Sequence, residues 1–228
     1  YLEILGERNS FSKTDKEATF MRMKEDYMRN GQLKPGYNLQ IGVISEYIVS
    51  YDIFHNPSDT KTLIPFLEKI KSQNIEVKNV VADAGYESLS NYEYLKINNY
   101  VSYIKPIYYE KSKTRKYKKD LNRVENLEYN EEENRLFRKD GLELEFLYYG
   151  KDKKTIYFRN PETEKKVRYN YEFRKLSKES KDNIKSEFGK QLRMNRSIQV
   201  EGAFAAIKED MKLRKLKVRG KNSVKREI

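Results

Sequence analysis

The changing spacing of apolar residues between positions 37 and 104 constrains the fold more than any other feature of the sequence. Two runs in this stretch, Tyr37–Ile44 and Tyr47–Phe54, are rich in β-branched and aromatic residues, as strands are. Only Ser45 and Glu46 separate the runs. Because so short a connection joins antiparallel neighbours, the two runs predict a β-hairpin.

The segments after the hairpin alternate between helix and strand patterns. Four apolar residues recur at the i, i+3, i+4 and i+7 positions of a helix: Leu63, Phe66, Leu67 and Ile70. A short apolar strand, Val80–Ala82, ends at Asp83, and a helix over Ser88–Asn98 and a strand over Tyr100–Ile104 follow. The order β-β-α-β-α-β predicts an α/β fold. It places Asp83 at the carboxyl edge of a sheet, where open α/β sheets bind ligands.

The sequence divides into four predicted parts. Residues 1–35 are polar and are expected to be irregular, and residues 36–104 form the first part of the core. Residues 105–175 alternate short β-prone pieces with turns and are interpreted as a β-rich insertion. Residues 176–228 regain helical character and end in a basic tail.

The composition limits the kinds of site that the chain can hold. Its 228 residues have a formal net charge of +12, which predicts attraction to a polyanion, with nucleic acid as the first choice. A lysine-rich protein from an AT-rich genome would have the same balance. The chain has no cysteine and one histidine, His55, which excludes thiolate zinc sites, cysteine nucleophiles and His-rich metal sites. No signal peptide or membrane span is evident, so the cytoplasm is the expected location.

Two carboxylates are the candidates for chemistry. Asp83 ends a strand, although an Asp in that position is most often a helix cap or a turn residue. Glu201 lies among apolar residues in the best predicted helix, although it can equally be a solvated Glu with Ala-rich neighbours. Together they suggest a site for Mg²⁺, which prefers carboxylate oxygens and supports phosphoryl transfer without His or Cys.

Five stretches of the sequence resemble the catalytic region of DDE-type bacterial transposases. Two of them hold the candidate carboxylates: VVADAGYES around Asp83 and RMNRSIQVEGAFAAIKEDM around Glu201. The other three are DKEATFMRMKEDYMRNGQLKPGYNLQ, NPSDTKTLIPFLEKI and YIKPIYYEKSKTRKYKKD. The resemblance is to the group of insertion sequence 1182, within the insertion sequence 4 superfamily, whose members have a Tyr-Arg-Glu-Lys pattern around the Glu.

The resemblance implies a ribonuclease H-like fold of the α/β (α+β) class, with a mixed five-stranded sheet and flanking helices. It also implies cleavage of DNA strands at the ends of a mobile element and joining of the freed 3′ hydroxyl to a target. By position, Asp83 matches the second Asp and Glu201 the Glu that together bind two Mg²⁺ or Mn²⁺ ions. The implied partners are element-end and target DNA in the nucleoid, with a homodimer in the transpososome as a further option and no membrane.

Charge and resemblance together select candidate residues for DNA contact. One basic cluster opens the insertion, with Tyr108, Tyr109 and Tyr117 interleaved, and a second lies in the tail, where a solvated, partly disordered segment is the alternative. Lys208 matches the Lys of the four-residue pattern, whereas the Arg position holds Ser197. The DNA-binding candidates are Lys113, Arg115, Lys116, Lys118, Lys119, Arg196, Lys208, Lys212, Arg214, Lys215, Lys217 and Arg219.

One further acidic residue lies in a family-like stretch. His55 and Asp59 belong to HNPSDT, which matches a loop of the family. We interpret Asp59 as a cap of the helix that follows, with a role in the site as the alternative.

The family's first Asp has no match in this sequence, and both ends of the chain look cut. Asp15, Asp26 and Asp52 do not fit the motif of that first Asp. We therefore expect an incomplete, inactive fragment whose sheet lacks the strand between the hairpin and Asn79–Asp83. Two alternatives stay open: a non-catalytic remnant that only binds DNA, and a nuclease of the same fold that hydrolyses DNA without joining it.

Overall fold

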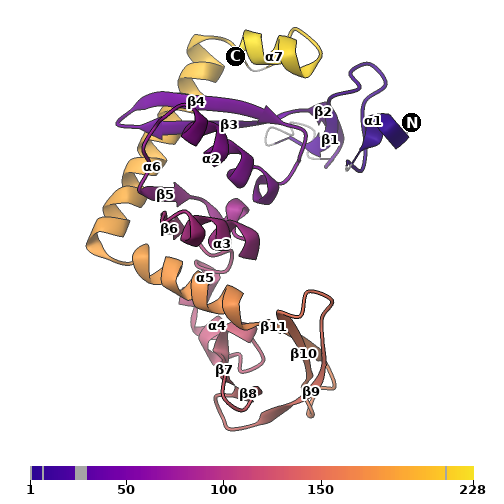
Figure 1. Cartoon of the computed structure of the whole chain (residues 1–228), viewed down its shortest axis with the longest axis vertical. Coiled ribbons are helices and arrows are strands. Elements are labelled where there is room, and N and C mark those ends of the chain that lie inside the picture. Colours follow the sequence, from indigo (N-terminus) through magenta and orange to yellow (C-terminus); the bar gives the residue numbers. More distant parts are fainter. Residues whose placement is uncertain (1, 7, 24–29, 214) are drawn as a thin grey trace.

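The computed structural model describes residues 2–6, 8–23, 30–213 and 215–228 (Figure 1). Its strands are β1 (Thr19–Arg22), β2 (Leu33–Gly36), β3 (Asn38–Ile44), β4 (Tyr47–Phe54), β5 (Asn79–Ala82), β6 (Val101–Ile104), β7 (Leu127–Asn130), β8 (Arg135–Arg138), β9 (Glu143–Tyr149), β10 (Thr155–Arg159) and β11 (Lys166–Asn170). Its α-helices are α1 (Leu2–Leu5), α2 (Leu63–Ser72), α3 (Leu89–Ile97), α4 (Arg115–Lys119), α5 (Tyr171–Asn183), α6 (Glu187–Ala205) and α7 (Lys221–Glu227).

Short helical turns join several of these elements. The 3-10 turns are η1 (Asp59–Lys61), η2 (Ala84–Tyr86), η3 (Lys111–Lys113) and η4 (Val124–Asn126), and a π-helical turn, η5 (Ala206–Asp210), continues α6. The mixture of helices and strands confirms the predicted α/β class.

The predicted hairpin is present. Strands β3 and β4 pair antiparallel, with Ile44 opposite Tyr47 across the turn. Ser45 and Glu46 both have positive φ angles, 49° and 73°. A two-residue turn of this kind matches the right-handed twist of the strands that it joins. The hairpin therefore forms although neither turn residue is glycine.

The main core lies between the predicted helices and strands. The four apolar residues of α2 that recur at helical spacing are all buried, which confirms the predicted amphipathic helix. They share one hydrophobic cluster with Tyr92 and Leu95 of α3 and with Ile104 of β6. Leu176 of α5 belongs to the same cluster, so residues far apart in the sequence close this core.

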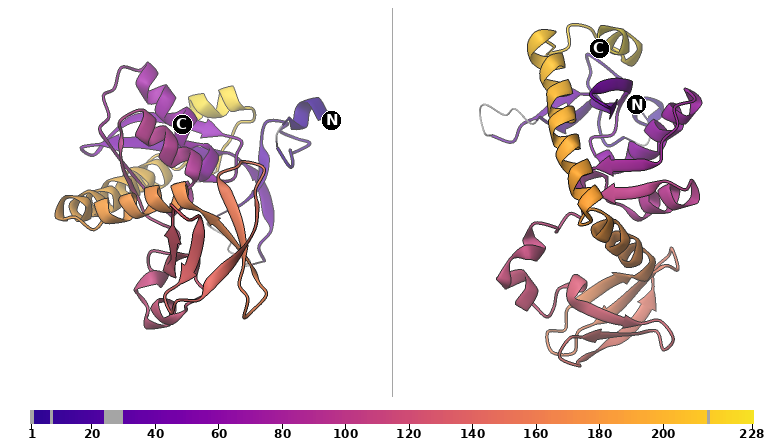
Figure 2. Two further views of the ribbon diagram at one scale, coloured as in Figure 1. Left: turned by 60° about the horizontal axis from the view of Figure 1, so that its bottom comes forward. Right: turned by 90° about the vertical axis from the view of Figure 1, so that its left-hand side faces the viewer.

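The strands of the core do not form one continuous sheet. Strands β3 and β4 form an antiparallel pair and β5 and β6 a parallel pair, and no ladder joins the two pairs within the described part of the chain. The two pairs are therefore separate sheets, and the expected missing strand between them stays a prediction. Helix α6 contacts both β3 and β5, and Figure 2 shows it running alongside both pairs.

The segment interpreted as an insertion forms an antiparallel sheet of its own. Its strand order is β11-β10-β9-β8-β7, and it lies at the end of the molecule away from the β3–β4 hairpin (Figure 1). One face covers a second cluster centred on Leu136, Phe158 and Tyr169, all nearly or fully buried. This sheet thus has a core separate from that of α2, α3, β5 and β6.

The first 35 residues are less irregular than expected. Strands β1 and β2 pair antiparallel, with Thr19 opposite Gly36 and Arg22 opposite Leu33. Each strand has four residues, too few for alternation to distinguish a strand from a loop. No helix in the described ranges combines the length and the apolar character that crossing a membrane requires.

Helix α7 docks on β4 through an ion-paired group. Asp52 lies 2.8 Å from Lys225 of α7 and 3.5 Å from Lys69 of α2. Burial alone would raise the pKa of Asp52, but hydrogen bonds from Lys225 and the Ile53 amide, with the Lys69 charge, lower it below its usual value. Burial lowers the pKa of Lys69 despite the nearby carboxylate, so we regard Lys225, at the shorter distance, as the principal partner.

Replacing Asp52 by Asn is therefore expected to destabilise the chain at neutral pH by about 1.5 kcal/mol, the low end of the scale for a hydrogen bond to a charged group, because the pair is partly exposed. The stabilisation by Asp52 is present while it is ionised, because its folded pKa is depressed. It is lost as the pH falls through that pKa, so the difference between Asp52→Asn and parent should shrink below about pH 4. Urea unfolding at pH 7 and pH 3 measures this; a constant difference would contradict it.

Candidate functional site

Asp83 connects strand β5 to the rest of the predicted site. It is the N-cap of η2, and its Oδ1 accepts a hydrogen bond from the Gly85 amide at 3.0 Å. Its Oδ2 forms an ion pair with the guanidinium of Arg196, on α6, at 3.2 Å. The side chain is 49% exposed. Asp83 thus lies at the end of a strand, as predicted, and also caps the turn that follows. Its ion pair with Arg196 joins it to the helix that carries Glu201.

Asp59 is not the helix cap that we expected. Ser58 caps η1 by accepting from the Thr60 amide. The Asp59 Oδ1 atom instead accepts hydrogen bonds from the side-chain amides of Asn38, at 2.7 Å, and Gln40, at 3.1 Å. Asp59 points toward the hairpin because β3 offers these two donors.

Asp59 and Asp83 lie at the same edge of the core. A Cβ atom added to Gly85 would stand 3.0 Å from Asp59 Oδ2 and 3.1 Å from Asp83 Oδ1. The two carboxylate oxygens are therefore at most about 6.1 Å apart. A glycine at position 85 leaves open the space that lies between them.

A buried polar network ties this edge to the hairpin. The Tyr86 hydroxyl donates to Gln40 Oε1, and Gln40, 5% exposed, also donates to Asp59. Burial, followed by the charges of Asp59 and Asp83, raises the pKa of Tyr86 well above its usual range. Tyr86 thus stays a neutral donor at physiological pH. The network holds the turn that follows Asp83 against β3, across the interruption in the sheet.

Glu201 lies on α6 with a different orientation from Arg196. It is exposed, and its Oε1 atom lies 3.2 Å from the hydroxyl of Ser197, one turn earlier. At about 100° per residue, five residues place Glu201 roughly 140° around the helix from Arg196, which contacts Asp83. No group of three or more His, Cys, Asp or Glu side chains positioned to hold a metal occurs among the residues that the structure describes. The convergence of Asp83 and Glu201 stays a prediction.

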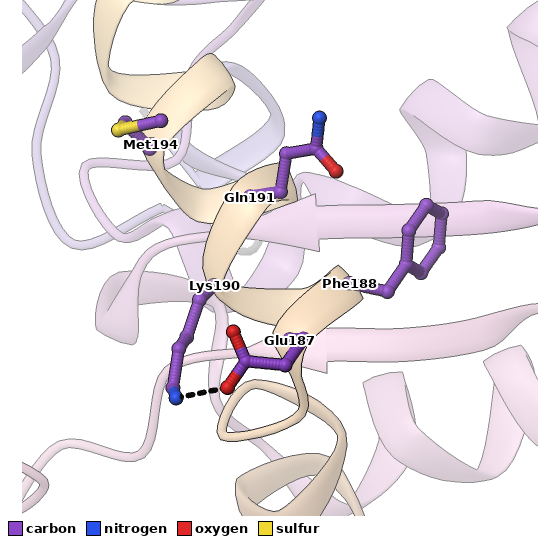
Figure 3. A pocket seen from close by; sticks show the side chains of 5 residues that line it. All are labelled: Glu187, Phe188, Lys190, Gln191 and Met194. Carbon is purple, nitrogen blue, oxygen red and sulfur yellow. Dashed lines mark hydrogen bonds and ion pairs between the residues drawn. The ribbon is translucent and has the colours of Figure 1, made fainter.

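A hollow lies beside the first turns of α6 (Figure 3). Its lining residues are Glu187, Phe188, Lys190, Gln191 and Met194. Glu187 and Lys190 pair with each other at 2.6 Å. Because none of the lining residues is a predicted catalytic residue, this hollow does not form part of the candidate site.

The basic cluster at the start of the insertion presents its cations but not all of its aromatic rings. All five candidate side chains are exposed: Lys113, Arg115, Lys116, Lys118 and Lys119. Tyr109 and Tyr117 are buried, at 8% and 7% exposure, and Tyr117 donates to Glu125. The burial of these two rings disfavours base stacking by them, whereas Tyr108 is 44% exposed. Phosphate contact by the cluster stays a prediction.

The basic tail is partly docked. Lys212, Lys215, Lys217 and Arg219 are exposed, and Lys208 is partly buried on η5. The Lys217 amide donates to the Glu227 carboxylate at 3.0 Å. Arg214, also a candidate, lies outside the described residues.

Asn38, Gln40 and Tyr86 were not identified from the sequence. Asn38 and Gln40 alternate with apolar residues along β3, as solvent-facing residues of a strand do. The position of Tyr86 in the sequence does not distinguish a site residue from a core residue. The one signal in the sequence was that Asn38 and Gln40 share a strand face and could reach the loop that contains Asp59.

One comparison with known proteins gives a match. A family model described as a transposase DDE domain matches residues 11–228 of the chain. No curated protein and no solved structure matches it. The matched residues include β5 with Asp83, the whole insertion sheet, and α6 with Arg196 and Glu201.

Proposed function

The chain belongs to the family of transposase DDE domains, which are DNA phosphoryl transfer enzymes, and from this premise we propose the role of each site residue. It is the catalytic region that cleaves DNA strands at the ends of a mobile element and joins them to a target. The observation that carries this proposal is the contact of Asp83 with Arg196, because it joins the end of β5 to the helix that carries Glu201.

The donors at this edge fit a divalent metal. Members of this family generally use divalent ions, and Mg²⁺ or Mn²⁺ prefers carboxylate oxygens. Asp83 and Asp59 present such oxygens at most about 6.1 Å apart. Asp83 and Glu201 would hold the metal ions, two in the complete site, with Asp59 beside them. Bound ions supply activation of the attacking oxygen and stabilisation of the leaving oxygen.

The chain's own residues prepare this edge for an anionic substrate. Arg196 compensates the charge of Asp83 and, on a helix that faces the same edge, presents a cation to a DNA phosphate. The network of Asn38, Gln40 and Tyr86 orients Asp59 and the turn after Asp83. Gly85 keeps the space between the carboxylates clear.

The core is an interrupted ribonuclease H-like sheet. The interruption lies between β3 and β5, and α6 contacts both of these strands. A strand in this position would be antiparallel to β3 and parallel to β5, and would make one mixed five-stranded sheet of the separate pairs. The unpaired backbone groups on both sides are a reason for low solubility of the chain by itself. In this proposal residues 36–104 and 176–228 form the core, and residues 105–175 form the insertion.

A second candidate function is supported by a separate observation. No three-ligand metal group occurs in the part of the chain that the structure covers, while the cations of the insertion cluster and the tail are exposed. In this second candidate function the chain binds DNA through these cations without cutting it. A hydrolytic nuclease of the same fold is distinguished by its failure to join strands.

Because no residue of this sequence matches the family's first Asp, we expect the purified chain to bind duplex DNA with a steep dependence on salt but not to nick or join it. Each phosphate neutralised by a Lys or Arg contributes a slope of about −0.9 to the logarithm of affinity against the logarithm of salt. Replacing Lys113, Arg115, Lys116, Lys118 and Lys119 by Gln should flatten that slope. Filter binding gives the slope, and supercoiled plasmid with Mg²⁺ or Mn²⁺ reports nicking.

Lys71→Gln/Lys96→Gln, on the surfaces of α2 and α3, is the control and should leave the slope nearly unchanged. Absent or salt-insensitive DNA binding would contradict the proposed substrate. Metal-dependent nicking that disappears in both Asp83→Ala and Glu201→Ala would show that the chain is active by itself. It would also mean that another carboxylate, with Asp59 and Asp52 as candidates, serves as the third ligand.

A further inference from the structure

The outer face of the insertion sheet carries an aromatic and basic group that none of the preceding site assignments uses. It consists of Tyr148 on β9, Tyr157 on β10, and Lys166 and Arg168 on β11, and we call it the tyrosine–cation cluster. Tyr148 is opposite Tyr157, and Tyr157 is opposite Arg168, so three neighbouring strands supply adjacent positions on one face. The inner face of the same strands is filled by Ile156, Phe158 and Tyr169.

The two tyrosine rings form one platform. Their centroids are 4.9 Å apart and their planes differ by 30°, a stacked arrangement. The Lys166 ammonium lies 4.8 Å from the Tyr148 centroid and 5.4 Å from that of Tyr157, and donates to the Tyr148 hydroxyl. Tyr148 is nevertheless 46% exposed. A pair of rings fixed in place by a cation and open to solvent loses little entropy when a further ring stacks on it.

The cations of the cluster have no close ion-pair partner. Neither Lys166 nor Arg168 forms an ion pair with a carboxylate among the residues that the structure describes, and both are exposed. By contrast, Arg159 on the same face of β10 is paired with Glu145 at 2.5 Å. Lys166 lies opposite this pair across the β10–β11 ladder and keeps its own charge available to a ligand.

The hollow next to the rings extends this surface. Tyr148, Tyr149, Lys151, Tyr157 and Arg168 all line it. Asp152 also lines the hollow; hydrogen bonds from the side chain and amide of Thr155 hold its carboxylate and lower its pKa, and its charge offsets part of the charge of Arg168. A hollow with aromatic walls and cations at its rim has both the apolar surface and the charge that a nucleotide requires.

We propose that the tyrosine–cation cluster binds a single-stranded segment of DNA, with a base stacked on the rings and phosphates at Lys166 and Arg168. Stacking on aromatic side chains beside a basic groove is how proteins hold unpaired bases, whereas bases inside a duplex are already stacked on each other. An apolar protein partner would not explain two exposed cations beside the rings. This inference rests on DNA being the substrate, as proposed above, but not on Asp83, Glu201 or metal.

The test compares the binding of labelled oligo(dT) and of a duplex of equal length by the full chain, in EDTA, by fluorescence anisotropy. Tyr148→Ala/Tyr157→Ala should weaken oligo(dT) binding by about fivefold to 150-fold, since stacking contributes about 1–3 kcal/mol per base. The duplex affinity should change much less. Tyr148→Phe/Tyr157→Phe keeps both rings and should bind oligo(dT) within about twofold of the parent. Lys166→Gln/Arg168→Gln should reduce the salt slope on oligo(dT) by about 1.4.

Tyr47→Ala, at the tip of the β3–β4 hairpin, removes a ring of 76% exposure elsewhere and is the matched control. Circular dichroism establishes that each variant is folded; if Tyr148→Ala/Tyr157→Ala is not, the Lys166→Gln/Arg168→Gln slope decides. Oligo(dT) binding that is absent in the parent, unchanged in the folded variants, or lost equally on duplex DNA would overturn the proposal. Binding is measured in EDTA and needs no cleavage, so failure of catalysis and failure of this surface are distinguishable.

Discussion

Gly189→Ala should lower the free energy of unfolding by about 3 kcal/mol or more, at the upper end of overpacking effects. A Cβ atom at position 189 would lie 1.9 Å from the backbone oxygen of Asn183 and 2.9 Å from the Ile184 Cα. These are backbone atoms at the end of α5, so no side-chain rotation relieves the clash. The first turn of α6 would have to move away from α5, and with it the helix that carries Arg196 and Glu201.

Gly202→Ala supplies a matched control for this prediction. Gly202 lies on the same helix, and an added Cβ would meet nothing within 4 Å. Because Ala favours a helix over Gly by about 0.8–1.0 kcal/mol, this variant should be as stable as the parent or more stable. Urea unfolding followed by circular dichroism measures both variants. Equal stability of Gly189→Ala and the parent would show that the α5–α6 junction is not packed as described.

Asp83→Asn should abolish Fe²⁺-directed cleavage of the polypeptide at the candidate site. Ferrous ion replaces Mg²⁺ at carboxylate sites and, with ascorbate and peroxide, cuts the chain near its ligands. We expect the parent to be cut near residues 59, 83 and 201. The neutral amide of Asn binds a divalent ion much more weakly than a carboxylate, so the variant should lose all three cuts. Fragment masses give the positions.

Two variants make this experiment decisive. Asp120→Asn, an acidic residue that pairs with Arg123 in the insertion, should leave the cuts unchanged. Glu201→Gln should remove the cut near residue 201 and weaken the others. Cuts near residues 59 and 83 without one near 201 would contradict the convergence of Asp83 and Glu201. Cuts that persist in Asp83→Asn would show that the ion binds elsewhere.

The order of local elements was determined by the sequence alone. The hairpin, α2, β5, α3 and β6 lie where apolar spacing predicts them, because each is short and buries a face defined by its own residues. The position of Asp83 at the end of β5 follows from the same pattern. The four residues of β1 and of β2 were too few to show a period, and the N-terminal strand pair was missed.

Tertiary structure decided which polar groups face one another. Asp59 looked like a helix cap, but its neighbours on β3, 21 and 19 residues earlier in the chain, hold it beside Asp83. Tyr109 and Tyr117 looked like a stacking surface, yet packing buries them. Tyr148 and Tyr157 meet because the pairing of β9 with β10 places them opposite each other. Local spacing specifies helices and strands because their periods are properties of the backbone. Side-chain encounters between distant segments depend on how those elements pack, which no local period encodes.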